Sequence, residues 1–382
     1  MSDLNEHLPP EARDNAFLCG HEAAEAELRT AFESGRLAHA WLITGPKGIG
    51  KANLAYRFAR HVLKASKQSV EAPVISADAG LFGALPAEEV EFEEAGGLYV
   101  SPDDPVFKRV AAHGHSDLLG IERAWTDDKK KARKTAIAVD DVRQVNGFLR
   151  LTPGEGGWRV VIVDAADEMN ANAANALLKV LEEPPSRALL LLVSHSPGRL
   201  LPTIRSRCRR LSLNPLSDGH VSTLLERYAP DLNPTDRDTL VQLSDGSIGR
   251  ALELADEGGL EVHRELMDLL GDLPTLNMEK VHKLGDKLAR KEAEAAFRTA
   301  RDLLHWILSQ VIRESATGGA AGAINGPENA MNARLASLAA LDRWLEVWEK
   351  ITRLMERADG ANLDRKQVIL NVFHILGQVG AR

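Results

Sequence analysis

The chain has 382 residues, 44% hydrophobic and 27% charged, a composition typical of a globular protein with two or three domains. Its formal net charge of -8, from 47 basic and 55 acidic side chains, excludes a basic field over the whole surface but not local basic patches. Two cysteines, Cys19 and Cys208, are too few for a disulfide framework or a four-cysteine zinc site. The polar amino terminus does not resemble a signal peptide, and no apolar run approaches a membrane span, so we expect a cytoplasmic protein without a membrane partner.

A phosphate-binding loop is predicted near the amino terminus. Residues 38–44 (AHAWLIT) form a short apolar run, and Leu54, Phe58 and Val62 recur later at helical spacing. Between them, residues 45–55 (GPKGIGKANLA) nearly match the P-loop pattern G-x-x-x-x-G-K-[ST]. Since a strand, a loop and a helix follow one another, the context is the one that a P-loop needs.

The loop keeps only part of the P-loop chemistry. Backbone N–H groups at the helix start would hold phosphate, and Lys51 would reach the β- and γ-phosphates. Ala52 stands where a hydroxyl normally binds Mg²⁺. The nucleotide-binding candidates are Gly45, Lys47, Gly48, Gly50, Lys51, Ala52 and, from a later strand, Asp164.

The next hundred residues are less regular. Residues 67–105 are rich in Ala, Gly, Pro and acidic residues, which indicates an irregular insertion. A strand is expected within 117–125, and 126–136 is a charged segment of the kind that usually forms a solvated loop. Residues 139–151 predict a helix with an Asp cap.

A second strong signal begins at residue 158. Residues 158–170 (WRVVIVDAADEMN) open with an unbroken Val/Ile run, typical of a strand buried on both faces in a parallel sheet. A helix at 171–185, stopped by two prolines, and another buried strand at 188–197 follow. Strands that alternate with helices predict a doubly wound α/β domain.

Asp164 ends the strand at the edge where such sheets bind ligands, so its carboxylate could support a metal ion; a simple strand-end cap is the alternative. Hydrolytic relatives of this architecture usually carry a water-activating Glu next, where this chain has Ala165. Asp167 and Glu168 are close in sequence, but on a turn that leads to a helix we expect them to point elsewhere.

Apolar strands cease after residues 201–213 (LPTIRSRCRRLSL). Short helices are expected to about residue 260, followed by long amphipathic helices such as 292–312. We therefore expect α/β plus all-α architecture in three domains. These are an α/β domain at 1–213, a small helical domain at 214–261 and a helical domain at 262–382.

Four stretches together resemble the delta-prime family of bacterial DNA polymerase III clamp-loader subunits. They are GRLAHAWLITGPKGIGK, NALLKVLEEPP, TIRSRC and NLDRKQ, and the resemblance runs from about Leu18 to the end of the chain. It implies a P-loop AAA+ module, made of a parallel sheet with flanking helices and a small helical lid domain, followed by a helical collar domain. Ala165 and residues 362–367 (NLDRKQ) indicate delta-prime rather than gamma/tau.

The resemblance also implies partners. The family assembles with delta and gamma/tau subunits in a pentameric ring, which opens the sliding clamp and places it on primer-template DNA as part of the DNA polymerase III assembly. Within that ring, delta-prime resembles a rigid subunit that is not a motor.

Arg207, in the Ser-Arg-Cys motif, is implied to be an arginine finger that reaches a neighbour's ATP site in trans. Such fingers stabilise γ-phosphate charge and can supply about 10³–10⁵ in rate. The alternative is a surface arginine in a basic cluster with Arg205, Arg209 and Arg210.

Lys179 occupies the position where gamma-type relatives use a lysine for the DNA backbone. A phosphate contact there would add affinity that depends on salt but not on sequence. An exposed helix lysine is an equally good interpretation.

Several positions depart from the motor pattern. Besides Ala52 and Ala165, Gly249 stands where gamma-type relatives have a sensor arginine, and Arg250 lies about 100° further round the helix. Ser194 and His195 occupy the region of the other sensor, where we interpret His195 as a strand-end histidine. Many relatives also carry a four-cysteine zinc module where this chain has the insertion 67–105, which holds no cysteine, so neither zinc nor another metal is expected.

These departures predict a subunit without ATP hydrolysis of its own. Two alternatives stay open: an active AAA+ ATPase of the gamma/tau type, and a chain that binds ATP or ADP without hydrolysing it.

Overall fold

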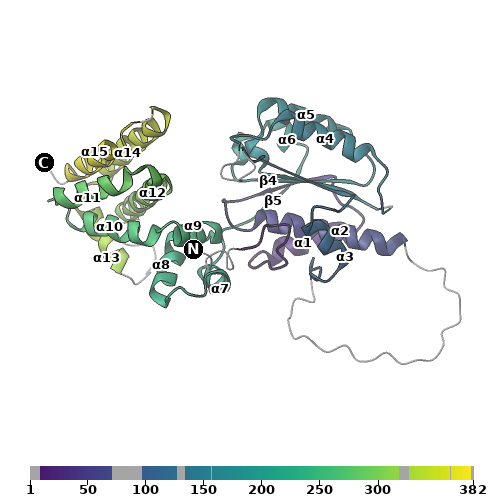
Figure 1. The fold of residues 1–382 in the computed structure, drawn as a ribbon, viewed down its shortest axis with the longest axis horizontal. Helices are drawn as coiled ribbons and strands as arrows, with labels where there is room; N and C mark the ends of the chain where they lie inside the picture. Colours follow the sequence, from purple (N-terminus) through teal and green to yellow (C-terminus); the bar gives the residue numbers. More distant parts are fainter. Residues whose placement is uncertain are drawn as a thin grey trace, which may run out of the picture. The chain divides into compact units, whose positions relative to one another are not determined.

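The structure is a computed structural model that describes residues 9–70, 97–126, 134–155, 157–317, 327–361 and 363–379 (Figure 1). Contacts within the chain group them into two compact units. The first holds the residues up to Ala229 together with Gly246–Gly249, and the second holds Pro230–Asp245 and the residues from Arg250 onward. Most of the predicted insertion, including the acidic stretch 88–94, lies outside the described residues.

A five-stranded parallel sheet in the order β2-β3-β4-β1-β5 forms the centre of the first unit. β1 lies between β4 and β5, so that Trp41 is opposite both Leu191 and Arg209. Because all strands run the same way, the loops after β1, β3 and β4 meet at one edge of the sheet. The strands are β1 (Ala40–Thr44), β2 (Leu118–Glu122), β3 (Arg159–Asp164), β4 (Ala188–Ser194) and β5 (Arg209–Ser212).

Helices cover both faces of this sheet (Figure 1). Alternate residues of a strand enter two different cores: Trp41 and Ile43 pack with α1, α2 and α3, whereas Leu42 packs with α4, α5 and α6. A strand covered on both faces needs apolar side chains at every position, which explains the unbroken Val/Ile and Leu runs. The helices of this unit are α1 (Glu22–Glu33), α2 (Lys51–Val70), α3 (Pro105–Ala111), α4 (Val139–Arg150), α5 (Ala171–Glu182), α6 (Pro202–Arg205) and α7 (Asp218–Tyr228), with 3-10 turns at Ala166–Glu168 and Pro197–Arg199.

Three local details differ from the sequence-based expectation. The predicted insertion begins later than residue 67, since α2 continues to Val70, and it ends at α3, where Asp104 caps the helix by accepting the N–H of Val106 at 2.8 Å. β5 was not predicted, because only one of its four side chains is buried. The expected Asp cap of α4 is also wrong: the N-cap is Ala138, whose N–H is accepted by the Asp141 carboxylate at 3.0 Å.

The second unit is helical throughout its described residues. α12 packs against α10, α13 and α14, and α15 packs against α11 and α14. Large side chains such as Trp344 and Phe373 are fully buried in it. Its helices are α8 (Pro234–Ser244), α9 (Ile248–Asp256), whose first two residues belong to the first unit, α10 (Gly259–Gly271), α11 (Met278–Leu288), α12 (Glu294–Thr317), α13 (Pro327–Ser337), α14 (Leu341–Ala361) and α15 (Arg365–Gly377), with a 3-10 turn at Lys291–Ala293.

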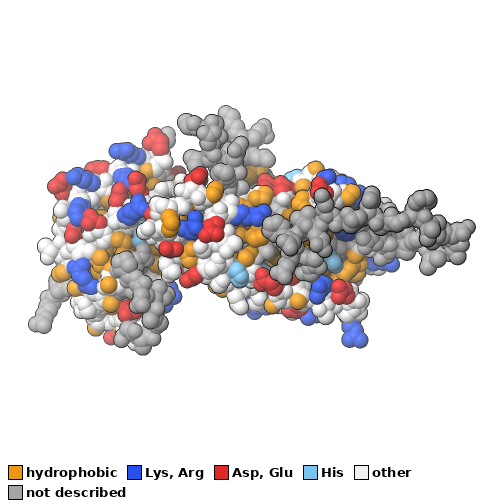
Figure 2. Space-filling model, turned by 90° about the horizontal axis from the view of Figure 1, so that it is seen from below, with side chains coloured by type: hydrophobic (Ala, Val, Ile, Leu, Met, Phe, Trp, Pro, Cys, Tyr) orange, Lys and Arg blue, Asp and Glu red, His pale blue; other side chains and the backbone are white. Residues whose placement is uncertain are grey.

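The expected fold class, an α/β module joined to helical structure, is confirmed. On the face shown in Figure 2, basic and acidic side chains are interspersed, so no field of a single sign covers that face. Among the described helices, none combines the length and apolar character needed to cross a bilayer.

Candidate functional site

The P-loop connects β1 to α2, and its lysine is turned back onto the loop itself. Lys51 is only 3% exposed, and its Nζ donates to the carbonyl oxygen of Gly45 at 2.8 Å and to that of Pro46. Burial lowers the pKa of Lys51 to about 8, against the opposing effect of the Asp164 and Asp167 carboxylates. The ammonium group is thus already satisfied by loop carbonyls.

A distant segment of the same unit closes against the loop. Ser247 Oγ donates to the carbonyl oxygen of Lys47 at 2.8 Å, and the Gly249 nitrogen donates to that of Gly48 at 2.9 Å. A Cβ added at Gly249 would lie 2.8 Å from the Gly48 Cα, closer than real Cβ contacts allow. Residue 249 therefore makes a backbone contact that only glycine permits.

His21 holds the loop from its other side. Its Nε2 donates to the carbonyl oxygen of Ile49 at 2.6 Å, and the side chain is buried. Burial lowers the pKa of His21, although this hydrogen bond acts in the opposite direction. Sequence reasoning missed His21, because a lone histidine before a helix carries no motif.

The acids that follow β3 are engaged in holding the structure. Asp167 accepts the backbone N–H of His195 at 3.0 Å and that of Ser196 at 3.1 Å, which fixes the turn after β4. Glu168 forms an ion pair with Arg123 at 2.6 Å. Ala165 is buried and has no acid–base group. Both nearby carboxylates therefore have structural partners.

Asp167 and His195 also shape the electrostatics of this edge. Burial acts to raise the pKa of Asp167, but the hydrogen bonds that its carboxylate accepts, above all from the His195 N–H, outweigh burial, and the pKa is lowered. Burial, together with the charge of Lys51, lowers the pKa of His195 to about 4. The imidazole is therefore neutral near pH 7.

Arg250 follows Gly249 in α9 and is half-buried. It belongs to the second unit, where burial lowers the pKa of its guanidinium against the opposing charges of Asp302, Asp245 and Glu253. Within the described residues, no group of three or more His, Cys, Asp or Glu side chains could hold a metal ion.

Arg207 lies near the ends where the strands of the sheet begin, whereas the P-loop lies at the other end of the strands, after β1 finishes. Arg207 precedes β5 by two residues, and β5 starts beside Trp41 and ends beside Thr44, after which the P-loop begins. Arg207 and the P-loop therefore lie beyond opposite ends of β1. Since a parallel strand rises about 3.3 Å per residue, the length of β1 separates them. Arg207 therefore cannot serve the P-loop of its own chain without crossing the sheet.

The Arg207 guanidinium is held by two neighbours. Its Nη2 forms an ion pair with Glu182 Oε1 at 2.8 Å, and its Nη1 donates to the carbonyl oxygen of Thr203 at 3.0 Å. The side chain keeps 35% of its surface exposed. Glu182 lies within the LEEPP stretch that contributed to the family resemblance, but its contact with Arg207 could not be read from the sequence.

The other arginines around Arg207 do not share its surroundings. Arg209 pairs with Glu27 at 2.8 Å and its guanidinium lies 4.6 Å from the centre of the Trp41 ring. Arg210 Nε donates to Thr44 Oγ1 at 3.4 Å. The basic cluster of the sequence is therefore divided among several separate partners.

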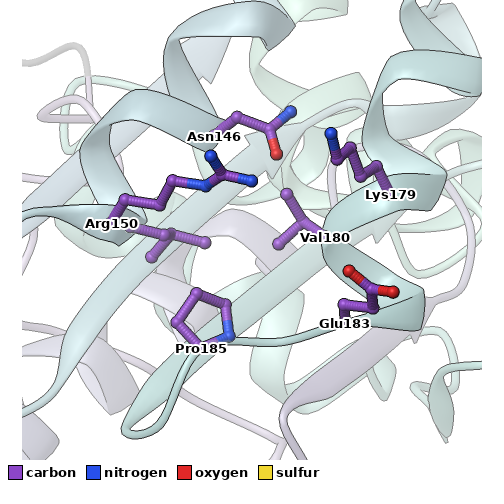
Figure 3. Close-up of a pocket in the computed structure, with 7 residues that line it drawn as sticks. Asn146, Arg150, Lys179, Val180, Glu183 and Pro185 are labelled. Carbon is purple, nitrogen blue, oxygen red and sulfur yellow. The ribbon is translucent and has the colours of Figure 1, made fainter.

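Lys179 lies beside a small hollow between α4 and α5 (Figure 3). Asn146 and Arg150 from α4 line the same hollow, and Glu183 adds a negative charge. Its volume of about 20 Å³ suits a single water molecule, so an anion could only sit at its rim.

The fold and the loop together define a class of protein. A loop of P-loop spacing between β1 and α2 of a β2-β3-β4-β1-β5 parallel sheet, with an acid at the end of β3 and a later segment that closes against the loop, defines a P-loop nucleotide-binding module. Residues 20–78 and 102–217 match the family model "DNA polymerase III, delta subunit". Over these stretches, which are less than half of the chain, it is similar to DNA polymerase III clamp-loader subunits, among them a delta' subunit.

Relatives of both clamp-loader types are similar to this chain. The Pseudomonas aeruginosa DNA polymerase III subunit delta' is 37% identical over 232 residues, which are 60% of each chain. The Mycobacterium tuberculosis DNA polymerase III subunit gamma/tau is 26% identical over 359 residues, which are 87% of this chain and 56% of the relative. The chain thus matches less than two thirds of the length of either relative.

Among solved structures, a Thermotoga maritima protein related to the DNA polymerase III gamma subunit covers 92% of this chain and 99% of its own. Its TM-score is 0.37 at 18% identity.

Proposed function

We propose that this chain works as the delta-prime subunit of a DNA polymerase III clamp loader. In this role it is a scaffold that does not hydrolyse ATP itself. It donates Arg207 to the ATP site of a neighbouring gamma/tau subunit while the assembly loads the sliding clamp on primer-template DNA. The lid and collar domains expected at 214–261 and 262–382 would hold it in a ring with gamma/tau and delta.

The placement of Arg207 is the observation that carries this proposal. An exposed guanidinium at the edge opposite the P-loop can approach a γ-phosphate only if another chain supplies that phosphate. An arginine suits this task because it is always charged and its planar fork matches phosphate oxygens. The 37% identity to a delta' subunit supports the same role.

The P-loop supports the second half of the proposal, the lack of hydrolysis. Ala52 offers no hydroxyl for Mg²⁺, Ala165 offers no base, and Gly249 offers no sensor charge. The residues present therefore do not fit a hydrolytic Mg²⁺–ATP site. Loss of a general base alone costs about 10²–10⁴ in rate.

The test is a reconstituted complex with and without the finger. Arg207→Ala should leave assembly intact and lower the DNA-stimulated ATPase rate of the complex by about 10³ at the one site that it serves. Arg205→Ala, two residues away and exposed, is the matched control and should have the wild-type rate. A wild-type rate for the Arg207 variant would refute the finger.

The gamma/tau-type motor is the alternative function, and the isolated chain distinguishes the two. We expect negligible ATP turnover both by the wild type and by Ala165→Glu, because the Mg²⁺ hydroxyl and the sensor charge are still missing. Substantial turnover that depends on Lys51 would favour the motor.

We further propose that Lys179 contributes one phosphate contact to DNA. The support is its exposed position beside Arg150, where two cations and the Asn146 amide surround one hollow (Figure 3). Lys179→Ala should reduce the salt dependence of DNA binding by the complex by about one ion, and an unchanged slope would argue against the contact.

A further inference from the structure

We propose that Glu182 is a positioning residue for the Arg207 finger. This inference rests on the proposed function of Arg207 in a clamp-loader assembly. The carboxylate would fix the direction in which the guanidinium leaves the surface, so that a neighbour's phosphate meets a group already oriented for it.

The contact geometry is the first support. Glu182 Oε1 lies 2.8 Å from Nη2, and the Thr203 carbonyl oxygen lies 3.0 Å from Nη1, so each terminal nitrogen of the guanidinium has one fixed acceptor. Two acceptors from different elements define the plane of the group, which a single acceptor would leave free to rotate. A side chain with many rotamers is thereby restricted before any partner arrives.

The two acceptors themselves stand on rigid structure. Glu182 is the last residue of α5, and two prolines follow closely, which prevents the helix from continuing. Thr203 lies in α6, which packs against α5. The backbone N–H of Arg207 donates to Ile204 of the same helix at 3.1 Å. The finger therefore leaves from one end of a packed pair of helices rather than from a free loop.

The pairing still leaves the guanidinium able to bind phosphate. A guanidinium has five N–H donors, of which Glu182 and Thr203 occupy two. The remaining three include the Nε–H, and 35% of the side chain is exposed. Glu182 can therefore stay in place when a phosphate binds, so its effect is to orient the finger rather than to mask it.

The experiment measures ATP turnover by the reconstituted complex with saturating primed DNA and clamp. An exposed ion pair shifts an equilibrium by up to about fivefold, so Glu182→Ala should lower kcat at the one site that Arg207 serves by up to about fivefold, with KM for ATP unchanged. Glu182→Gln keeps an acceptor oxygen and should recover most of the rate. Asp140→Ala removes an exposed carboxylate of α4 that pairs with Arg143, away from both the finger and the hollow beside Lys179, and should match the wild type.

A double-mutant cycle separates positioning from a general effect on α5. In the Arg207→Ala background, Glu182→Ala should cause no further loss, because the residue acts only through the finger. A loss of equal size in that background would overturn the inference, and so would an increase in kcat, which would mean that Glu182 competes with phosphate. If Arg207→Ala lowers the rate and Glu182→Ala does not, only this inference fails; if Arg207→Ala itself has no effect, the proposed function fails.

Discussion

The backbone nitrogen of Gly249 donates a hydrogen bond of 2.9 Å to the carbonyl oxygen of Gly48, joining the P-loop to a segment about two hundred residues away in the sequence. Gly48 has a φ of +78°, and a Cβ there would meet the Ser247 hydroxyl oxygen at 2.4 Å. Gly48 is therefore required both for its positive φ and because a Cβ would have no space, whereas Gly249 is required because a Cβ would have no space.

Gly249→Ala should destabilise the first unit. The new Cβ would lie 2.8 Å from the Gly48 Cα, and since the neighbour is backbone, the loop or the segment must shift. We expect a loss of about 1–3 kcal/mol in the free energy of unfolding, measured by urea denaturation. Gly147→Ala is the matched control. Gly147 is exposed in α4, and no atom lies within 4 Å of a Cβ added there. This substitution should therefore leave stability unchanged or raise it slightly. Equal stability of the two variants would contradict the close contact.

ATP binding by the isolated chain should be weak. Lys51 is held by the carbonyl oxygens of Gly45 and Pro46, and two charge-assisted contacts of an ordinary site, each worth about 1.5–3 kcal/mol, are missing. We expect no saturation by a fluorescent ATP analogue below about 100 μM, and the same result for Lys51→Ala. A micromolar dissociation constant that this substitution abolishes would show instead that the loop still binds nucleotide.

Asp167→Asn should cost stability without affecting any reacting group. An Asn side chain has one acceptor oxygen for the two backbone N–H groups of His195 and Ser196, and it lacks the charge that strengthens both bonds. We expect a loss of about 1–3 kcal/mol in thermal or urea unfolding. Asp140→Asn, at an exposed carboxylate that pairs with Arg143, serves as the control and should change stability by less than about 0.5 kcal/mol. The prediction fails if both variants behave alike.

His195 should make the protein sensitive to mild acid. Its pKa is about 4 in the folded chain against an ordinary value of 6.5, so between these values the unfolded chain binds more protons than the folded chain. The stability that depends on a neutral His195 is therefore complete above pH 6.5 and is lost as the pH falls toward 4. The wild type should lose about 1–2 kcal/mol more than His195→Gln between pH 7 and pH 5. Parallel urea titrations at the two pH values measure this difference, and identical losses would rule it out.

The elements that could be predicted are those whose environment leaves a local trace in the sequence. β1, β3 and β4 are covered on both faces and therefore read as unbroken apolar runs, and the P-loop between β1 and α2 has a spacing set by phosphate geometry. β5 is parallel to β1 as well, yet it is an edge strand with three exposed side chains and carries no such trace.

The contacts that organise the candidate site could not be predicted either, because they leave no local pattern in the sequence. Gly249 against Gly48, His21 against Ile49 and Glu182 against Arg207 each join residues that the fold brings together, and no periodicity or spacing encodes them. The sequence could show that Gly249 is not an arginine, but only the structure shows that a side chain there would collide with the loop. The roles of the site residues themselves stay predictions.

Because Arg207 and Lys51 lie at opposite ends of the strands, neighbouring subunits at the two ends of the sheet would meet different residues. If the proposed function holds, neighbours in the ring are stacked head to tail, each offering one edge of its sheet to the opposite edge of the next. A subunit that gives an arginine at one edge and has no working hydrolytic site at the other fits only at one end of a row of active sites. Ala52, Ala165 and Gly249, which offer the P-loop of this chain no hydroxyl, no base and no sensor charge, would thus mark the end of the row of ATP sites.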